Sequence, residues 1–308
     1  VGHQALSSNI TGSSNTAVGR VALNYSTGND NTAVGTYSLF WQTIGARNTA
    51  IGSGAFQSNV AGSNGTAIGY HAMYYADNRV ASFTNYNVAL GYEALRGSLT
   101  ASNNTGNFIT ALGYRSLFNN TTGSSNTAIG FQSLLANTTG NANIAIGSEA
   151  NHENINGSNN VDIGFYAGQF SSGTGSVHIG RDAGRYDDAN YNVMIGYRSG
   201  YDNTAANAYG TNNTFIGNNT DAVGNNLSNA SAFGANAIVG QSNALILGNG
   251  ADVGIGTSNP EELLHMKGTD ADLDIETNDI SESSSIHFRR SRGTPALPSI
   301  VANGDFIA

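Results

Sequence analysis

The chain repeats one short phrase at a nearly constant interval, and this periodicity constrains its fold more than any other feature. The phrase is Asn-x-Ala-Ile-Gly, as in NTAIG at 126–130 and NIAIG at 143–147. Its glycines recur every 16 or 17 residues, with three longer intervals of 21 or 22. A short period kept this long predicts stacked repeats rather than a globular domain. The repeat glycines are Gly2, Gly19, Gly35, Gly52, Gly69, Gly91, Gly113, Gly130, Gly147, Gly164, Gly180, Gly196, Gly217 and Gly234.

Each repeat carries the pattern of a short β-strand that ends at its glycine. The residue before glycine is mostly Val, Ile or Leu, and the residue two positions earlier is mostly Thr, Val or Ile, as in Thr16 and Val18. These two side chains share one face, because side chains alternate along a strand. The residue between them, such as Ala17, is small in the first half, so its face is expected to meet another backbone closely.

A second pair after the glycine, such as Ala22 and Leu23, predicts another short strand in each coil. Polar turns such as NNTTGSSN at 119–126 close the coil, since Asn and Gly accept left-handed conformations. The asparagine four residues before glycine, as in Asn126, is expected to stack into a ladder of side-chain amides. The predicted fold is all-β: a repetitive parallel β-roll or β-solenoid.

The position four residues after each glycine changes character along the chain. It holds Leu, Phe or Met up to Leu134 and then becomes Asn151, Gly168, Gly184 and Gly200. We expect the packing between chains to tighten or change near residue 150.

Composition excludes several classes of partner. Of the 308 residues 39% are hydrophobic, and the net charge of −9 provides no basic stripe for a nucleic acid. Without cysteine there is no disulfide framework and no thiolate metal site. No run of about 18 apolar residues occurs, so membrane insertion is not expected. Because Val1 and Gly2 begin inside a repeat, we expect the sequence to be an internal piece of a longer polypeptide.

Three parts are expected along the chain. Residues 1–256 form the stacked coils of about 17 residues. Residues 257–268 form a short helical neck, in which Ser258 or Asn259 caps a helix and Pro260 takes its first position. Residues 269–308 begin a small β domain, because ADLDIET at 271–277 alternates like a half-buried strand, and we expect this domain to be truncated.

The repeat resembles the head repeat of trimeric autotransporter adhesins, and its longer form at 124–141 is more similar to repeats of phage tail fibres. The segment VGIGTSNPEELLHMKG at 253–268 resembles the junction that leads out of such repeats, and 287–305 resembles a module placed ahead of an endosialidase-type chaperone. The resemblance implies a left-handed β-roll packed as a homotrimer. It transfers no catalytic residue, because the chaperone with its self-cleaving serine lies outside these residues.

Longer coils at 70–87, 92–107 and 197–213 carry clusters of aromatic residues. Exposed rings beside Asn, Asp and Arg can stack on sugars. The alternative interpretation is that these loops only fill the junctions between subunits. The candidate receptor contacts are Tyr70, Tyr74, Tyr75, Tyr86, Tyr197, Tyr201 and Tyr209.

Other kinds of site are less favoured by the residues. Asp162 and His178 occupy one repeat position and suggest a polar or ion-holding lining of a trimer axis. A polysaccharide-cleaving site would have to use the cluster of Arg181, Asp182, Arg185, Asp187 and Asp188. Calcium binding by Asp187, Asp188, Asp270, Asp272, Asp274 and Glu276 lacks any recognised spacing.

An ice-binding surface is a further alternative, because Thr16, Thr32 and Thr49 begin a row of threonines, but later repeats carry Val or Ile there, which suggests burial. We therefore expect a fibre segment without enzymatic activity, metal or cofactor, located outside the cell on a virion or a cell surface. Its partners would be its own copies, a host surface glycan or protein receptor, and other particle or fibre proteins. A bacterial trimeric adhesin or surface filament is the alternative, and a polysaccharide-cleaving solenoid the third choice.

Overall fold

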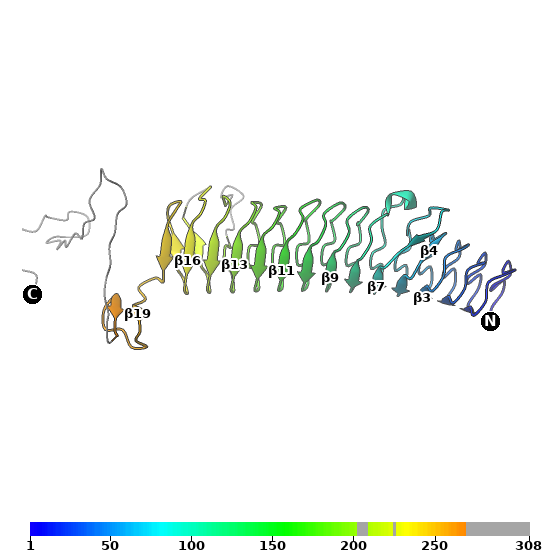
Figure 1. Ribbon diagram of the computed structural model, residues 1–308, viewed down its shortest axis with the longest axis horizontal. Helices are drawn as coiled ribbons and strands as arrows, with labels where there is room; N and C mark the ends of the chain where they lie inside the picture. The colour runs from blue at the N-terminus through cyan, green and yellow to red at the C-terminus, as the bar shows by residue number, and fades with distance from the viewer. Residues whose placement is uncertain (202–208, 224–225, 269–308) are drawn as a thin grey trace, which may run out of the picture. The chain divides into compact units, whose positions relative to one another are not determined.

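The computed structural model describes residues 1–201, 209–223 and 226–268, and the chain divides into two units between Ala251 and Asp252. The first unit is a parallel β-solenoid of about 13 turns, in which each sequence repeat forms one coil. Figure 1 shows its strands lying side by side in chain order. The prediction of an all-β, repetitive parallel solenoid is confirmed.

One parallel sheet contains 14 strands, and its order follows the sequence. Each of these strands is three residues long and ends immediately before a glycine. The strands are β1 (Thr16–Val18), β2 (Thr32–Val34), β3 (Thr49–Ile51), β5 (Thr66–Ile68), β7 (Val88–Leu90), β8 (Thr110–Leu112), β9 (Thr127–Ile129), β10 (Ile144–Ile146), β11 (Val161–Ile163), β12 (Val177–Ile179), β13 (Val193–Ile195), β14 (Thr214–Ile216), β16 (Ser231–Phe233) and β18 (Leu245–Leu247).

Shorter elements accompany this sheet. The longer coil at 70–87 contains β6, and the longer coil at 92–107 contains a 3₁₀ helix. Two of the three short strand pairs lie towards the C-terminal end of the described chain. The parallel pairs are β4 (Gly62–Ser63) with β6 (Phe83–Thr84), β15 (Asp221–Ala222) with β17 (Ile238–Val239), and β19 (Val253–Ile255) with β20 (Leu264–Met266); the 3₁₀ helix η1 spans Ala101–Asn103.

Equivalent residues of successive repeats pair in register, so each repeat position becomes a straight column along the sheet. The central residue of each strand points into the coil and the two flanking residues point outwards, as the alternation predicts. Ala17 is 6% exposed and Val18 is 43% exposed. The small central residue therefore meets the opposite wall of its own coil. The threonine row, whose burial the sequence suggested, lies on the outer face and remains half-exposed in this chain.

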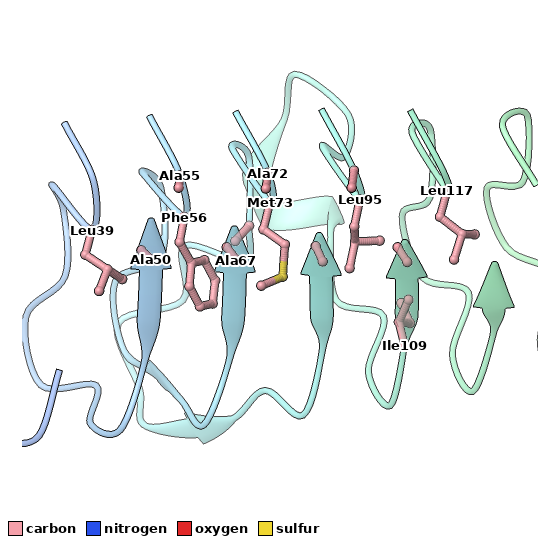
Figure 2. Packing of buried hydrophobic residues seen from close by; sticks show 14 of the residues in the cluster. Leu39, Ala50, Ala55, Phe56, Ala67, Ala72, Met73, Leu95, Ile109 and Leu117 are labelled. Carbon is pink, nitrogen blue, oxygen red and sulfur yellow. The ribbon is translucent and has the colours of Figure 1, made fainter. Parts of the chain in front are cut away.

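The interior of the coils up to Ala150 is a thin hydrophobic core. Leu134, four residues after its glycine, is fully buried and belongs to the same cluster as the strand residue Ala128. Figure 2 shows the larger side chains Leu39, Phe56 and Met73 on one wall, pointing towards the alanines of the strands. The repeat position that changes near residue 150 therefore lies inside each coil, and the change alters packing within the chain.

The repeat glycines lie where successive coils approach most closely. Their φ angles fall between +103° and +144°, a region that L-residues rarely adopt. A Cβ atom on Gly130 would lie 2.3 Å from the carbonyl oxygen of Gly147 in the next coil. Glycine at this position therefore permits both the turn and the close stacking of coils.

An asparagine ladder runs beside the strands. The Oδ1 atom of Asn126 accepts a hydrogen bond from the backbone N–H of Asn143 at 2.9 Å, and its Nδ2 atom donates to the carbonyl of Gly140 at 2.8 Å. Asn143 repeats both contacts with the coil that follows. The expected ladder thus forms, but each amide bonds to backbone groups rather than to the next amide. It satisfies buried backbone groups at the turn, where no strand pairing is available.

The second unit is described from Asp252 to Gly268, and it differs from the predicted helical neck. Residues 258–263 form bends, and Leu264–Met266 is a strand that pairs in parallel with β19. The helix prediction from Pro260 is wrong, because pairing with β19 satisfies this backbone instead. Leu263 and Leu264 are 71% and 57% exposed. The domain expected at 269–308 lies outside the described residues.

Candidate functional site

The structure offers two candidate sites: a buried polar group in the C-terminal coils, and aromatic columns on the surface. The first arises because large and small side chains change places between the two walls of the coil. After Ala150 the central strand residue becomes large while the position four after glycine becomes Gly. A Cβ atom on Gly184 would lie 2.0 Å from the His178 ring, and one on Gly200 would lie 2.1 Å from Met194 Sδ. The glycines leave space for side chains that cross the coil from the strand.

His178 lies between two carboxylates in this core. Its Nδ1 is 2.6 Å from Asp162 Oδ1, and its Nε2 is 3.0 Å from Asp187 Oδ2. All three side chains are fully buried. Asp187 also accepts hydrogen bonds from the backbone N–H of Ala189 and the side chain of Asn192, at 3.1 and 2.9 Å. Asp162 lies on β11, whereas His178 on β12 and Asp187 in the turn after β12 belong to the next coil, so stacking in register brings Asp162 to the other two.

The surroundings of His178 determine its charge. Carboxylate oxygens only accept hydrogen bonds, so both ring nitrogens are protonated when both carboxylates are ionised. Burial opposes this charge, but the hydrogen bonds to Asp162 and Asp187 outweigh it and raise the pKa of His178 to about 10. Burial raises the pKa of Asp162, against the opposing effect of the His178 hydrogen bond. The group is therefore an imidazolium held between carboxylates in a closed core.

This group has acid–base side chains but no access for a substrate. Its three side chains are sealed inside the coil, so Asp162 and His178 line the coil's own interior, and their expected place on an axis between chains is wrong. The Arg and Asp cluster considered from the sequence is also divided. Asp187 is internal, whereas Asp182 lies 3.2 Å from Arg185, and Asp188 accepts a hydrogen bond from Ser172 on the surface. These charges form no shared groove.

The second candidate is an aromatic column one residue after the glycines. Neighbouring rings are nearly parallel, with centroids 5.1 to 5.3 Å apart, and each ring is between 38% and 47% exposed. Stacking covers the faces of the inner rings and leaves their edges to solvent. Of these rings the sequence singled out only Tyr70, although the shared repeat position would have identified the others. The column consists of Tyr70, Tyr92, Tyr114 and Phe131.

The other candidate tyrosines do not gather at one place. Tyr74 and Tyr75 contact each other edge-on, with centroids 4.7 Å apart. Tyr86 is 52% exposed and stacks on Phe108.

The C-terminal tyrosines also lie in separate environments. Tyr197 is 40% exposed and lies beneath the Arg198 guanidinium, whereas the Tyr201 ring contacts Tyr186 edge-on. Tyr209 does not fit a receptor contact, because it is 4% exposed and its hydroxyl donates to Asp221.

Neither a metal centre nor a membrane-spanning helix is found among the described residues. Within residues 1–201, 209–223 and 226–268, no group of three or more His, Cys, Asp or Glu side chains has a geometry that could hold a metal ion. Asp270, Asp272, Asp274 and Glu276 lie outside this part of the chain. No helix in the described part combines the length and apolar character needed to cross a membrane.

Comparison with known proteins adds no assignment. No protein-family model matches the chain, and a search of curated proteins finds no significant match. The function has to be argued from the fold and its surfaces.

Proposed function

We propose that this chain is a structural and adhesive segment of an extracellular fibre, a phage tail fibre or a similar surface fibre. Three copies pack side by side as left-handed β-rolls, extend the fibre and carry it to a receptor on a host cell surface. The segment performs no chemistry of its own. The observation that carries the proposal is the outer face of the 14-stranded sheet.

That face carries an apolar row along the whole solenoid. Residues directly before the repeat glycines point outwards, and many are more than one third exposed. A continuous apolar strip of this length is unusual on a monomeric soluble protein and marks an interaction surface. A second and third copy that present the same strip around a common axis would cover it. The most exposed apolar members of the two outward columns are Val18, Ile51, Val88, Leu90, Ile129, Ile144, Leu245 and Leu247.

The coil geometry suits mechanical extension. Backbone hydrogen bonds join successive coils at the strands and also at the turns, for example from Leu117 N–H to the Ser133 carbonyl and from Leu134 N–H to the Ala150 carbonyl, both at 3.0 Å. These bonds lie along the stacking direction and bear load in parallel. A repeat solenoid of this kind gains its stability from each neighbouring coil.

The proposal is tested by the mass of the purified chain in solution. Multi-angle light scattering should give three times the chain mass of 31.8 kDa. Replacing Ile51 and Ile129 with Glu should yield monomers that keep the β circular dichroism signal, because both side chains lie outside the coil core. Thr122→Glu, on an exposed turn, is the matched control and should remain trimeric. A monomeric native chain would overturn the fibre assignment.

A bacterial surface filament is the second candidate, since the same apolar strip would serve it equally well. The following domain of the parent gene separates the two: an intramolecular chaperone favours the phage fibre, and a membrane anchor favours the adhesin. A polysaccharide-cleaving solenoid is the third candidate, and an assay for released sugars tests it directly.

A further inference from the structure

Trp41 stands at the edge of an open groove that the fibre proposal does not use. The groove has a volume of about 310 Å³ and is lined by Trp41, Thr43, Ser58, Val60 and Asn78. It spans successive coils and the beginning of the first long coil. The indole is 48% exposed, although it is the largest apolar side chain in the sequence.

Neighbouring rings hold the indole in one orientation. Tyr25, at the same repeat position in the preceding coil, stacks on it with centroids 5.4 Å apart and planes within 3°. Phe40 contacts it edge-on at 4.7 Å. A ring held in this way loses little further freedom when a ligand binds, which favours binding.

The column of rings stops directly after Trp41. The same position in the next coil holds Ser58, whose short side chain cannot stack on the indole. Further along the solenoid rings return at this repeat position, where Phe170 and Tyr186 stack with centroids 5.1 Å apart. The interruption at Ser58 therefore leaves a step beside the indole as wide as one coil, about 4.8 Å.

Three polar side chains lie around this step, and all three have hydrogen-bonding capacity left for a ligand. The Ser58 hydroxyl and the Asn78 side-chain amide make no hydrogen bond to any residue that the structure describes, and Thr43 donates its hydroxyl to the Val60 carbonyl at 3.0 Å. Thr43 Oγ1 thus keeps acceptor capacity. All five lining side chains are uncharged. An aromatic face beside neutral donors and acceptors suits a ring that has an apolar C–H face and hydroxyl edges.

We propose that this groove binds one neutral sugar ring of a surface glycan. The C–H face of the ring lies on Trp41, and its hydroxyls bond to Ser58, Asn78 and Thr43. The inference deepens the proposed function, on which it rests, by naming a receptor class and a position on the fibre. In a trimer three such grooves would act together, so weak single sites would give strong attachment.

The test uses the purified full chain on an array of neutral and acidic bacterial oligosaccharides. Neutral glycans should bind, and Trp41→Ala should reduce that binding at least tenfold, whereas Trp41→Phe should retain part of it. Tyr191→Ala removes an exposed ring that is not among the candidate receptor contacts and is the matched control. Because Trp41 is the only tryptophan in the chain, titration with a bound glycan should also shift the native fluorescence saturably.

Light scattering on the same samples separates the two proposals. A trimer that binds no neutral glycan, or that binds equally after Trp41→Ala, overturns the sugar site and leaves the fibre intact. Binding of acidic glycans alone also overturns it, because the groove has no cationic lining. A monomeric native chain contradicts the fibre itself.

Discussion

The coils before Ala150 and the coils from Asn151 to Asn192 share one backbone but have different interiors. In the first section an alanine on the strand faces a leucine, phenylalanine or methionine on the opposite wall. In the second, Asp162 and His178 extend from the strand towards glycines. The core can thus be filled from either wall, provided that the combined volume of the two side chains matches the narrow space between the walls.

The two solutions differ in the backbone conformation that they require. The position four after glycine is left-handed in both sections, with φ of 50° at Leu134 and 54° at Gly184. A leucine in this conformation costs about 1 kcal/mol, which its burial of roughly 1.5–3 kcal/mol offsets. Glycine avoids that cost but contributes no apolar contact. In the polar section the hydrogen bonds of His178 with Asp162 and Asp187 take the place of those apolar contacts.

The largest difference between the sections should appear when His178 is replaced. His178→Leu leaves Asp162 and Asp187 buried without their cation, which should lower the free energy of unfolding by about 3–5 kcal/mol. Met194→Leu, at the same position in the next coil, should cost less than about 1.5 kcal/mol. Denaturant titration of both variants measures this, and equal losses would contradict a special role for the buried ion group.

The second prediction concerns pH. Because the pKa of His178 is raised from 6.5 to about 10, its contribution to stability is complete below pH 6.5 and is lost as pH rises through 10. The raised pKa of Asp162 also makes the folded state more stable at lower pH. Unfolding free energy should therefore fall by up to about 1.4 kcal/mol per pH unit within this window.

A variant with the aliphatic pattern provides the control for this pH dependence. Asp162→Ala, Gly168→Leu, His178→Ala, Gly184→Leu and Asp187→Asn together give these coils the interior of the first section. The melting temperature of this variant should then no longer fall as pH rises from 6.5 to 10. If the melting temperature of this variant still falls with rising pH, groups other than His178 and its two carboxylates cause the pH dependence.

The smallest loss of stability is expected for a double variant that tests whether side-chain volume can move from one wall of the coil to the other. Gly200→Leu should cost about 1–3 kcal/mol, because its side chain overlaps Met194 in a filled core. Met194→Ala alone should cost about 2–5 kcal/mol through the cavity it leaves. The double variant restores the leucine–alanine pairing and should cost less than either change alone. Additive losses in this double-mutant cycle would show that the two walls are independent.

Much of the fold could be predicted from the repeat alone. The glycine period predicts the stack, and the residues at Thr16, Ala17 and Val18 predict the strand and its alternation. The prediction of a helix at 257–268 was wrong, because Pro260 and the preceding Ser and Asn resemble a helix start. The pairing of Leu264–Met266 with β19 is a contact between separate segments, which a local sequence pattern does not reveal. Tyr209 was misplaced for the same reason, since its burial depends on the coils around it.

The sequence by itself determined the period, the parallel register and the residue types that each coil position accepts, because these follow from local geometry repeated in every coil. Only the tertiary structure decided which face of each strand is interior, that His178 lies between Asp162 and Asp187, and that Trp41 borders an open groove. These features depend on distances between residues of different coils, which stacking fixes and a linear pattern does not contain.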